Sequence, residues 1–333
     1  MKKKILFHIE DLKQYFPVKK TGFREKQKFV RAVDGITLDI YEGETFGLVG
    51  ESGCGKSTLG RTLLQLYPQT EGRIVYRKED GQLVELSELK PEEIRGLRKE
   101  LQLIFQDPYS SLNPRMTVGQ IIGEGLVSHG IFKRGDPAMR DYIIQVMEEC
   151  GLDGYFFGRY PHQFSGGQRQ RIGIARSLVL KPRFVVCDEA VSALDVSIQS
   201  QVLNLLSTLK ERSDLTYLFI THDLSVVKYI SDRIGVMYLG NLVELADTEK
   251  LFDKPLHPYT EALLSAIPTT ELQDKRERIL LEGDIPSPVN PPEGCKFHTR
   301  CRYCKEKCTK EVPEFKELGE GHFVACHYPL QIS

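Results

Sequence analysis

Short apolar stretches alternate with polar turns over the first 50 residues. LFHI, FVRAV, ITLDI and TFGLV are separated by polar residues and by Gly43, a pattern that predicts β-strands. The last stretch leads into a glycine-rich loop, and STLGRTLLQLY, from Ser57 onward, has apolar residues at helical spacing. The order strand, glycine loop, helix is the context that a phosphate-binding loop requires.

Farther along the chain, the hydrophobic pattern predicts helices and then a parallel sheet. Apolar residues between Pro114 and Gly154 mark amphipathic helices. Two apolar strands, FVVCDEA and LTYLFITHD, then flank a helix around Gln199 to Lys210, and this alternation indicates parallel strands. Beyond about Pro255 prolines become frequent, which marks a linker into a cysteine-rich tail.

Composition excludes several classes of protein. The 45 Lys and Arg residues balance 46 Asp and Glu, so the basic footprint of a nucleic-acid-binding protein is missing. No apolar run reaches the roughly 18 residues of a membrane-spanning helix, and His8, Glu10 and Asp11 interrupt the start before a signal-peptide core could form. We therefore expect a cytosolic protein with no nucleic-acid partner.

A phosphate-binding loop is the strongest single motif. GESGCGKS matches G-x-x-x-x-G-K-[ST], in which backbone N–H groups and a helix N-terminus surround phosphate oxygens. Lys56 is predicted to contact the β- and γ-phosphates, and Ser57 to bind Mg²⁺. The predicted nucleotide contacts of the loop are Gly50, Ser52, Gly53, Cys54, Gly55, Lys56, Ser57 and Thr58.

A second acidic motif follows the strand FVVCDEA. A nucleotide site needs a carboxylate at the end of an apolar strand to hold the magnesium shell, and Asp188 is in that position. Glu189, the next residue, could polarise the attacking water. Alone, the pair would suit a solvated strand end or a helix cap, but the phosphate loop favours the catalytic interpretation.

The stretch PHQFSGGQRQRIGIARSL resembles the signature sequence of ATP-binding-cassette (ABC) proteins. Its centre is Ser165, Gly166, Gly167 and Gln168, a serine hydroxyl and glycine N–H groups that open a helix. The resemblance implies that these residues contact ATP held by a second subunit. Helix capping by Ser165 is compatible with that role.

The resemblance assigns further residues by their order along the chain. It implies that Gln106 senses the γ-phosphate and Mg²⁺, that the loop Ser192 to Asp195 crosses the dimer, and that His222 is the switch histidine. An aromatic residue near the N-terminus stacks on adenine in this family. Phe16 is the first choice and Tyr15 the second, and core packing is an equal alternative for either.

Longer phrases narrow the resemblance. VRAVDGITLDIYEGETFGLVGESGCGKSTLGRTLL, QLIFQDPYSSLNPRMTVG and KPLHPYTEALLSAIP look like the oligopeptide and dipeptide importer ATPases, and YFPVKK with NPRMTVG looks like their F-type second subunit. Phe164 replaces the leucine common in cassettes but is usual in this subfamily. Gln163 replaces a glutamate that is common in the family at the position linked to communication with the channel.

This resemblance implies an α/β P-loop fold with a mixed sheet, a nucleotide-binding domain over 1–255, a helical subdomain over about 107–175 and an extension over 256–333. ATP and Mg²⁺ would drive dimer closure with a non-identical cassette, at the cytoplasmic face of two transmembrane permeases served by an extracytoplasmic solute-binding protein. The alternative is an ATPase of DNA repair or translation. Cargo stays open among oligopeptides, dipeptides, nickel and other solutes.

Five of the eight cysteines crowd the last 40 residues, a cluster that indicates metal in a reducing compartment. Five, six and seventeen residues separate Cys295, Cys301, Cys308 and Cys326, spacings that suit a 4Fe-4S cluster. Similar tails occur in the peptide-importer ATPases. Zinc is an alternative, as is a metal-free cluster, and Cys304 is an extra cysteine that could replace one ligand.

Overall fold

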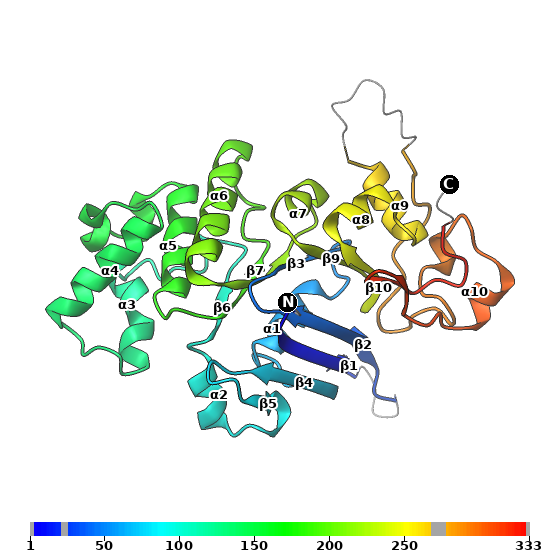
Figure 1. The fold of residues 1–333 in the computed structure, drawn as a ribbon, viewed down its shortest axis with the longest axis horizontal. Coiled ribbons are helices and arrows are strands. Elements are labelled where there is room, and N and C mark those ends of the chain that lie inside the picture. The colour runs from blue at the N-terminus through cyan, green and yellow to red at the C-terminus, as the bar shows by residue number, and fades with distance from the viewer. Residues whose placement is uncertain (1–2, 21–25, 268–277, 331–333) are drawn as a thin grey trace.

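Two β-sheets meet at the centre of the protein (Figure 1). The computed structural model describes residues 3–20, 26–267 and 278–330. The smaller sheet is antiparallel with the order β2-β1-β4-β5, and the larger has the order β11-β12-β10-β9-β3-β8-β7-β6. The strands are β1 (Ile5–Pro17), β2 (Phe29–Tyr41), β3 (Thr45–Val49), β4 (Glu71–Arg77), β5 (Leu83–Glu85), β6 (Leu101–Ile104), β7 (Phe184–Asp188), β8 (Thr216–Ile220), β9 (Arg233–Tyr238), β10 (Asn241–Asp247), β11 (Lys316–Gly319) and β12 (His322–Val324).

Most of the helices lie along the larger sheet or beyond its ends, and α2 lies beside β4 and β5 of the smaller sheet (Figure 1). They are α1 (Lys56–Leu63), α2 (Pro91–Leu97), α3 (Val118–Ser128), α4 (Pro137–Glu149), α5 (Gly166–Leu178), α6 (Val196–Ser213), α7 (Leu224–Ile230), α8 (Thr248–Asp253), α9 (Pro258–Ser265) and α10 (Glu306–Lys310). None of the helices in the described ranges has the length and apolar character of a membrane span.

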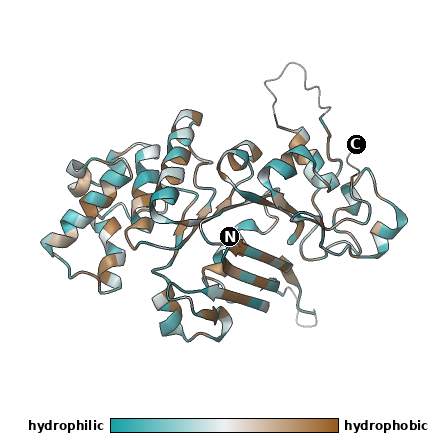
Figure 2. Cartoon of the chain, viewed as in Figure 1, coloured by the Kyte–Doolittle hydropathy of each residue, from teal (hydrophilic) through white to brown (hydrophobic). Residues whose placement is uncertain are grey.

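The parallel part of the larger sheet positions the site. Strands β6, β7, β8, β3 and β9 run parallel, and the sequence predicts this arrangement for β7 and β8. Every residue of β3, β7 and β8 is buried because helices or the smaller sheet cover both faces. Figure 2 shows these strands as mainly hydrophobic against the mixed colouring of the surrounding helices. Their carboxyl ends therefore form a rigid edge.

The smaller sheet differs from the sequence prediction in one respect. FVRAV and ITLDI, predicted as separate stretches, form the single strand β2, which pairs with β1 from Phe29 to Tyr41. The pairing of β1 with β2 has register shifts, which accommodate the polar residues between the two stretches. Among these, Gly35 takes a positive φ of 83° beside the Asp11 carboxylate. Pairing with β1 thus keeps a strand continuous where the local sequence suggests a turn.

Helices α3, α4 and α5 lie together at one end of the larger sheet (Figure 1, green). Thr117 caps α3, its hydroxyl accepting from the backbone N–H of Gln120. Ile122, Met147 and Ile172, one from each helix, are fully buried in a shared core. This core continues into the parallel sheet, so the region is firmly attached to the strands that position the site.

The chain after Pro255 returns to the larger sheet. Strand β12 pairs antiparallel with β10, and β11 pairs with β12. At this junction the buried Glu244 carboxylate lies 2.7 Å from His322 Nε2 and accepts backbone N–H groups from Leu256 and His257. The tail therefore adds strands to the larger sheet.

Candidate nucleotide site

The phosphate loop lies between β3 and α1. Gly50, Gly53 and Gly55 all have positive φ angles, of 148°, 80° and 108°. A Cβ added to Gly55 would lie 1.9 Å from the Ala32 carbonyl oxygen, and one added to Gly50 would lie 2.2 Å from that of Met237. Side chains at these positions would thus block the turn that brings backbone N–H groups together.

Lys56 is folded over this loop. The residue is only 5% exposed, and its ammonium donates to the carbonyl oxygens of Gly50 at 2.7 Å and Glu51 at 3.0 Å. It also lies 3.7 Å from the sulfur of Cys54, whose thiol has a pKa raised by burial. Ser52 is exposed and Thr58 is half-buried at the start of α1. The loop thus holds one buried cation beside its exposed turn.

Ser57 and Asp188 meet where magnesium binding is predicted. Ser57 Oγ donates to Asp188 Oδ1 at 2.6 Å, and the Asp188 side chain is 4% exposed at the carboxyl end of β7. The other carboxylate oxygen lies 3.3 Å from Arg61 Nη2. Hydroxyl and carboxylate oxygens are the ligands that Mg²⁺ prefers, so this pair suits that ion.

Glu189 lies between two other predicted residues. Gln106 Nε2 donates to Glu189 Oε2 at 2.6 Å, and His222 Nδ1 lies 3.5 Å from Oε1. The three follow β6, β7 and β8, whose carboxyl ends share one edge of the sheet. Glu189 has a φ of 49°, and its backbone N–H donates to the Ile220 carbonyl oxygen, which fixes this conformation. A carboxylate in this position can orient a water molecule.

The signature serine caps α5. Ser165 Oγ accepts from the backbone N–H of Gln168, and the Gln168 side chain accepts from the N–H of Ser165. Ser165 is exposed and Gly166 is half-buried, whereas a Cβ on Gly167 would lie 2.5 Å from Ile198. Capping leaves the exposed helix N-terminus able to contact a ligand held by another molecule.

The loop after Glu189 carries the next predicted contact. Ser192 Oγ donates to the Glu189 carbonyl oxygen at 2.9 Å. Asp195 is exposed, and its side chain forms no capping bond at the start of α6. The carboxylate of Asp195 therefore remains available on the surface.

The two aromatic candidates for adenine stacking differ in their contacts. The half-buried ring of Phe16 packs edge-on against Tyr67, with centroids 5.3 Å apart. The Tyr15 hydroxyl donates to Asp34, and the Arg31 guanidinium lies 5.9 Å from the Tyr15 ring centroid. Tyr15 is thus committed to a polar network, and Phe16 remains the better candidate.

Four of the tail cysteines line one small cavity. Cys295, Cys301, Cys308 and Cys326 surround a space of about 20 Å³, and Cys304 is exposed outside it. Burial raises the pKa of Cys295 to about 12 and that of Cys301 to about 11. No three His, Cys, Asp or Glu side chains in the described ranges are placed to hold a metal ion. The four thiols therefore share one cavity without forming a metal-binding group in this structure.

Sequence reasoning did not identify three residues near the loop. Arg61 contacts Asp188 and lies one helical turn beyond Ser57, a spacing that could have revealed it. Tyr259 Oη accepts from the backbone N–H of Glu51, and Arg300 pairs with the Glu51 carboxylate. Arg300 is part of the tail pattern C-x-F-x-x-R-C, but no local signal links it to the loop.

Taken together, this fold and site define an ATP-binding-cassette ATPase. The family model described as ABC transporter matches residues 33–192, and the model described as oligopeptide/dipeptide transporter, C-terminal region, matches residues 243–308. Among solved structures, the dimeric cassette MJ0796 bound to ADP and Pi covers 73% of this chain and 99% of its own, with a TM-score of 0.63 at 24% identity, a likeness of fold.

Curated relatives match almost the full length. The oligopeptide transport ATP-binding protein AppF of Bacillus subtilis is 52% identical, over 97% of each chain. The protein OppF of Escherichia coli, described in the same words, is 49% identical over 97% of this chain and 96% of its own. The chain therefore belongs to the oligopeptide-transport family of ABC ATP-binding proteins. This membership favours a transporter over the alternative of DNA repair or translation.

Proposed function

We propose that this chain hydrolyses ATP to power the import of oligopeptides or dipeptides through an ABC transporter. The observation that carries the proposal is the group Gln106, Glu189 and His222 beside the pair Ser57 and Asp188. Phosphoryl transfer to water depends on positioning and charge neutralisation, which is what such an edge of polar side chains can supply.

Each side chain has a role that follows from its contacts. Lys56 exchanges its loop carbonyls for β- and γ-phosphate oxygens, and Ser57 and Asp188 hold Mg²⁺. Bound Mg²⁺ would neutralise phosphate charge. Glu189 accepts a proton from the attacking water. Gln106 and His222 hold the Glu189 carboxylate in place and contact the γ-phosphate of ATP. Phe16 stacks on adenine.

The second half of each site comes from a partner. Ser165, Gly166, Gly167 and Gln168 contact ATP bound to a non-identical ABC subunit, and Asp195 lies at the same dimer boundary. Exposure of Ser165 and Asp195 supports this proposal. The family relation supports two transmembrane permeases, an indirect extracytoplasmic solute-binding protein, and peripheral attachment to the cytoplasmic face of the membrane.

Reconstitution tests this function. The chain is combined with candidate permeases and a second cassette from the same organism, in vesicles that receive a binding protein loaded with a defined peptide. We expect peptide-stimulated phosphate release and peptide uptake, both lost when either cassette is omitted. Full turnover by this chain as a homodimer contradicts the heterodimer, and stimulation by nickel or a glycoside in place of peptide contradicts the cargo.

We also propose that Cys295, Cys301, Cys308 and Cys326 bind a 4Fe-4S cluster with a structural role. The support is their convergence on one cavity and the four thiolates that such a cluster requires. Zinc, which would need four ligands at about 2.3 Å from one centre, is the alternative.

Anaerobic purification separates these possibilities. The cluster proposal expects brown protein that absorbs near ~400 nm and carries about four irons per chain. Cys308→Ser should remove the colour, and the matched Cys304→Ser variant should retain it because Cys304 lies outside the cavity. Colourless protein with one tightly bound zinc, or with no metal, overturns the proposal.

A further inference from the structure

The second residue of the phosphate loop is acidic. Glu51 follows Gly50, and its backbone carbonyl oxygen accepts from the Lys56 ammonium at 3.0 Å. Like charges repel strongly when poorly solvated, so a free carboxylate here would oppose the binding of a triphosphate. The loop thus requires something that neutralises Glu51 and keeps its carboxylate away from the anion.

Arg300, from the tail, has the geometry for this. Its Nη1 donates to Glu51 Oε2 at 2.7 Å and its Nη2 to Oε1 at 3.0 Å, a bidentate pair between residues 249 positions apart. The Arg300 side chain is only 6% exposed and the Glu51 side chain 25%. Bidentate, poorly solvated pairs are the strong ones, and they fix direction as well as charge.

Aromatic packing holds Arg300 in this place. Tyr238, Tyr259 and Phe297 pack together with ring centroids between 4.8 and 5.3 Å apart, and Tyr259 Oη accepts from the Glu51 backbone N–H at 2.9 Å. The Arg300 guanidinium lies 6.0 Å from the Tyr238 ring centroid. The backbone N–H and the carboxylate of Glu51 are thus both engaged by residues of the C-terminal part of the chain.

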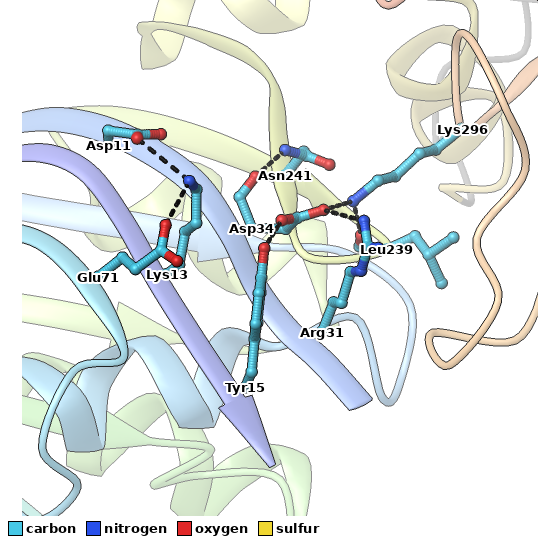
Figure 3. Close-up of polar contacts among 9 residues, drawn as sticks. All are labelled: Asp11, Lys13, Tyr15, Arg31, Asp34, Glu71, Leu239, Asn241 and Lys296. Carbon is cyan, nitrogen blue, oxygen red and sulfur yellow. Dashed lines mark hydrogen bonds and ion pairs between the residues drawn. The ribbon is translucent and has the colours of Figure 1, made fainter. Parts of the chain in front are cut away.

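A second contact ties the same segment to the other side of the site. Lys296 Nζ donates to Asp34 Oδ2 at 2.7 Å and to the Leu239 carbonyl oxygen at 2.9 Å, and Asp34 also accepts from the Tyr15 hydroxyl (Figure 3). Tyr15 precedes Phe16, the candidate adenine contact. The segment 295–301, bounded by two of the cavity cysteines, therefore reaches both sides of the nucleotide site.

We propose that Arg300 is a positioning residue for ATP binding: it neutralises Glu51 and holds the phosphate loop open for the triphosphate. The proposal rests on the nucleotide site assigned above and adds a role for the tail. Without Arg300, the Glu51 carboxylate faces the incoming anion. The resulting loss of nucleotide affinity grows with the charge of the phosphates, so ATP binding is weakened more than ADP binding.

Four variants of the full chain test this by titration with ATP and ADP. We expect Arg300→Gln to weaken ATP binding about tenfold and ADP binding less, from one uncompensated charge near the phosphates. Glu51→Gln should bind ATP at least as tightly as wild type. The double variant should regain the affinity of Glu51→Gln, a rescue that a purely structural role for Arg300 would not produce. Arg302→Gln is the matched control, because Arg302 makes an exposed pair with Glu261 in the same tail.

Several outcomes overturn the proposal. It fails if Arg300→Gln binds ATP like Arg302→Gln, if ATP and ADP affinities fall equally, or if the double variant shows no rescue. Weaker ATP binding by Glu51→Gln, which keeps the size of the side chain, overturns it even where Arg300→Gln does not fold. Wild-type protein that binds no ATP would instead contradict the proposed function.

Discussion

Replacing Glu189 with glutamine should separate ATP binding from hydrolysis. The substitution keeps side-chain size and removes the group proposed to accept a proton from water. The amide oxygen of the variant can still accept from Gln106 Nε2, which in the wild-type structure lies 2.6 Å from the Glu189 carboxylate. A bond to a charged group contributes about 1.5–3 kcal/mol and one to a neutral group about 0.5–1.5 kcal/mol, so the change in stability should stay near 1 kcal/mol.

Catalysis should fall far more than stability. Positioned acid–base groups contribute about 10²–10⁴-fold, so phosphate release should drop by at least about 100-fold. ATP binding should persist, and the variant should accumulate as a closed dimer with the partner cassette. Phosphate release is measured in the assembled transporter, and dimer closure by ATP-dependent cross-linking. Glu311→Gln, an exposed carboxylate in the tail, is the control. Hydrolysis by Glu189→Gln near the wild-type rate would refute the role of Glu189 as the base.

Three further predictions follow from local geometry. Gly55→Ala should abolish ATP binding because its Cβ would lie 1.9 Å from the Ala32 carbonyl oxygen, whereas Gly81→Ala, with a similar positive φ and no atom within 4 Å, should bind normally. Phe16→Ala should weaken ATP binding about fivefold and leave tripolyphosphate binding unchanged, since only the base stacks. Burial lowers the pKa of His257 to about 4. In the unfolded chain the pKa of this histidine is about 6.5, so at lower pH protonation favours the unfolded state. Urea melts should therefore show the free energy of unfolding falling by about 3 kcal/mol as the pH drops from ~6.5 to ~4. His257→Asn should flatten that slope.

Local patterns predicted the parts of the site that are continuous in sequence. The phosphate loop, the strand ending at Asp188 and the helix opened by Ser165 each have turn or period signals that arise from their own residues. Their order also indicated that β7 and β8 are parallel, which places Glu189 and His222 at one edge of the sheet. Strand β6, which brings Gln106 to the same edge, was not predicted, and Gln106 was found only through the family resemblance.

Contacts between distant segments had no such signal. The pair Arg300 and Glu51 joins residues 249 positions apart, and the return of the tail to β10 depends on a buried acid, Glu244, that reads as an ordinary strand residue in the sequence. The continuity of β2 through Gly35 was missed for the same reason, because pairing with β1 outweighs the local tendency to turn.

The strands of the tail also decide how the larger sheet ends. Strand β10 is buried along its centre, and alone it would present a row of unpaired backbone groups. Strand β12 covers that row, and the outermost strand is β11, four exposed residues that include Lys316 and Glu317. Short, charged outer strands resist pairing with other chains. A protein shortened before Lys316 would leave β10 open, and we expect it to associate edge to edge into β-rich aggregates.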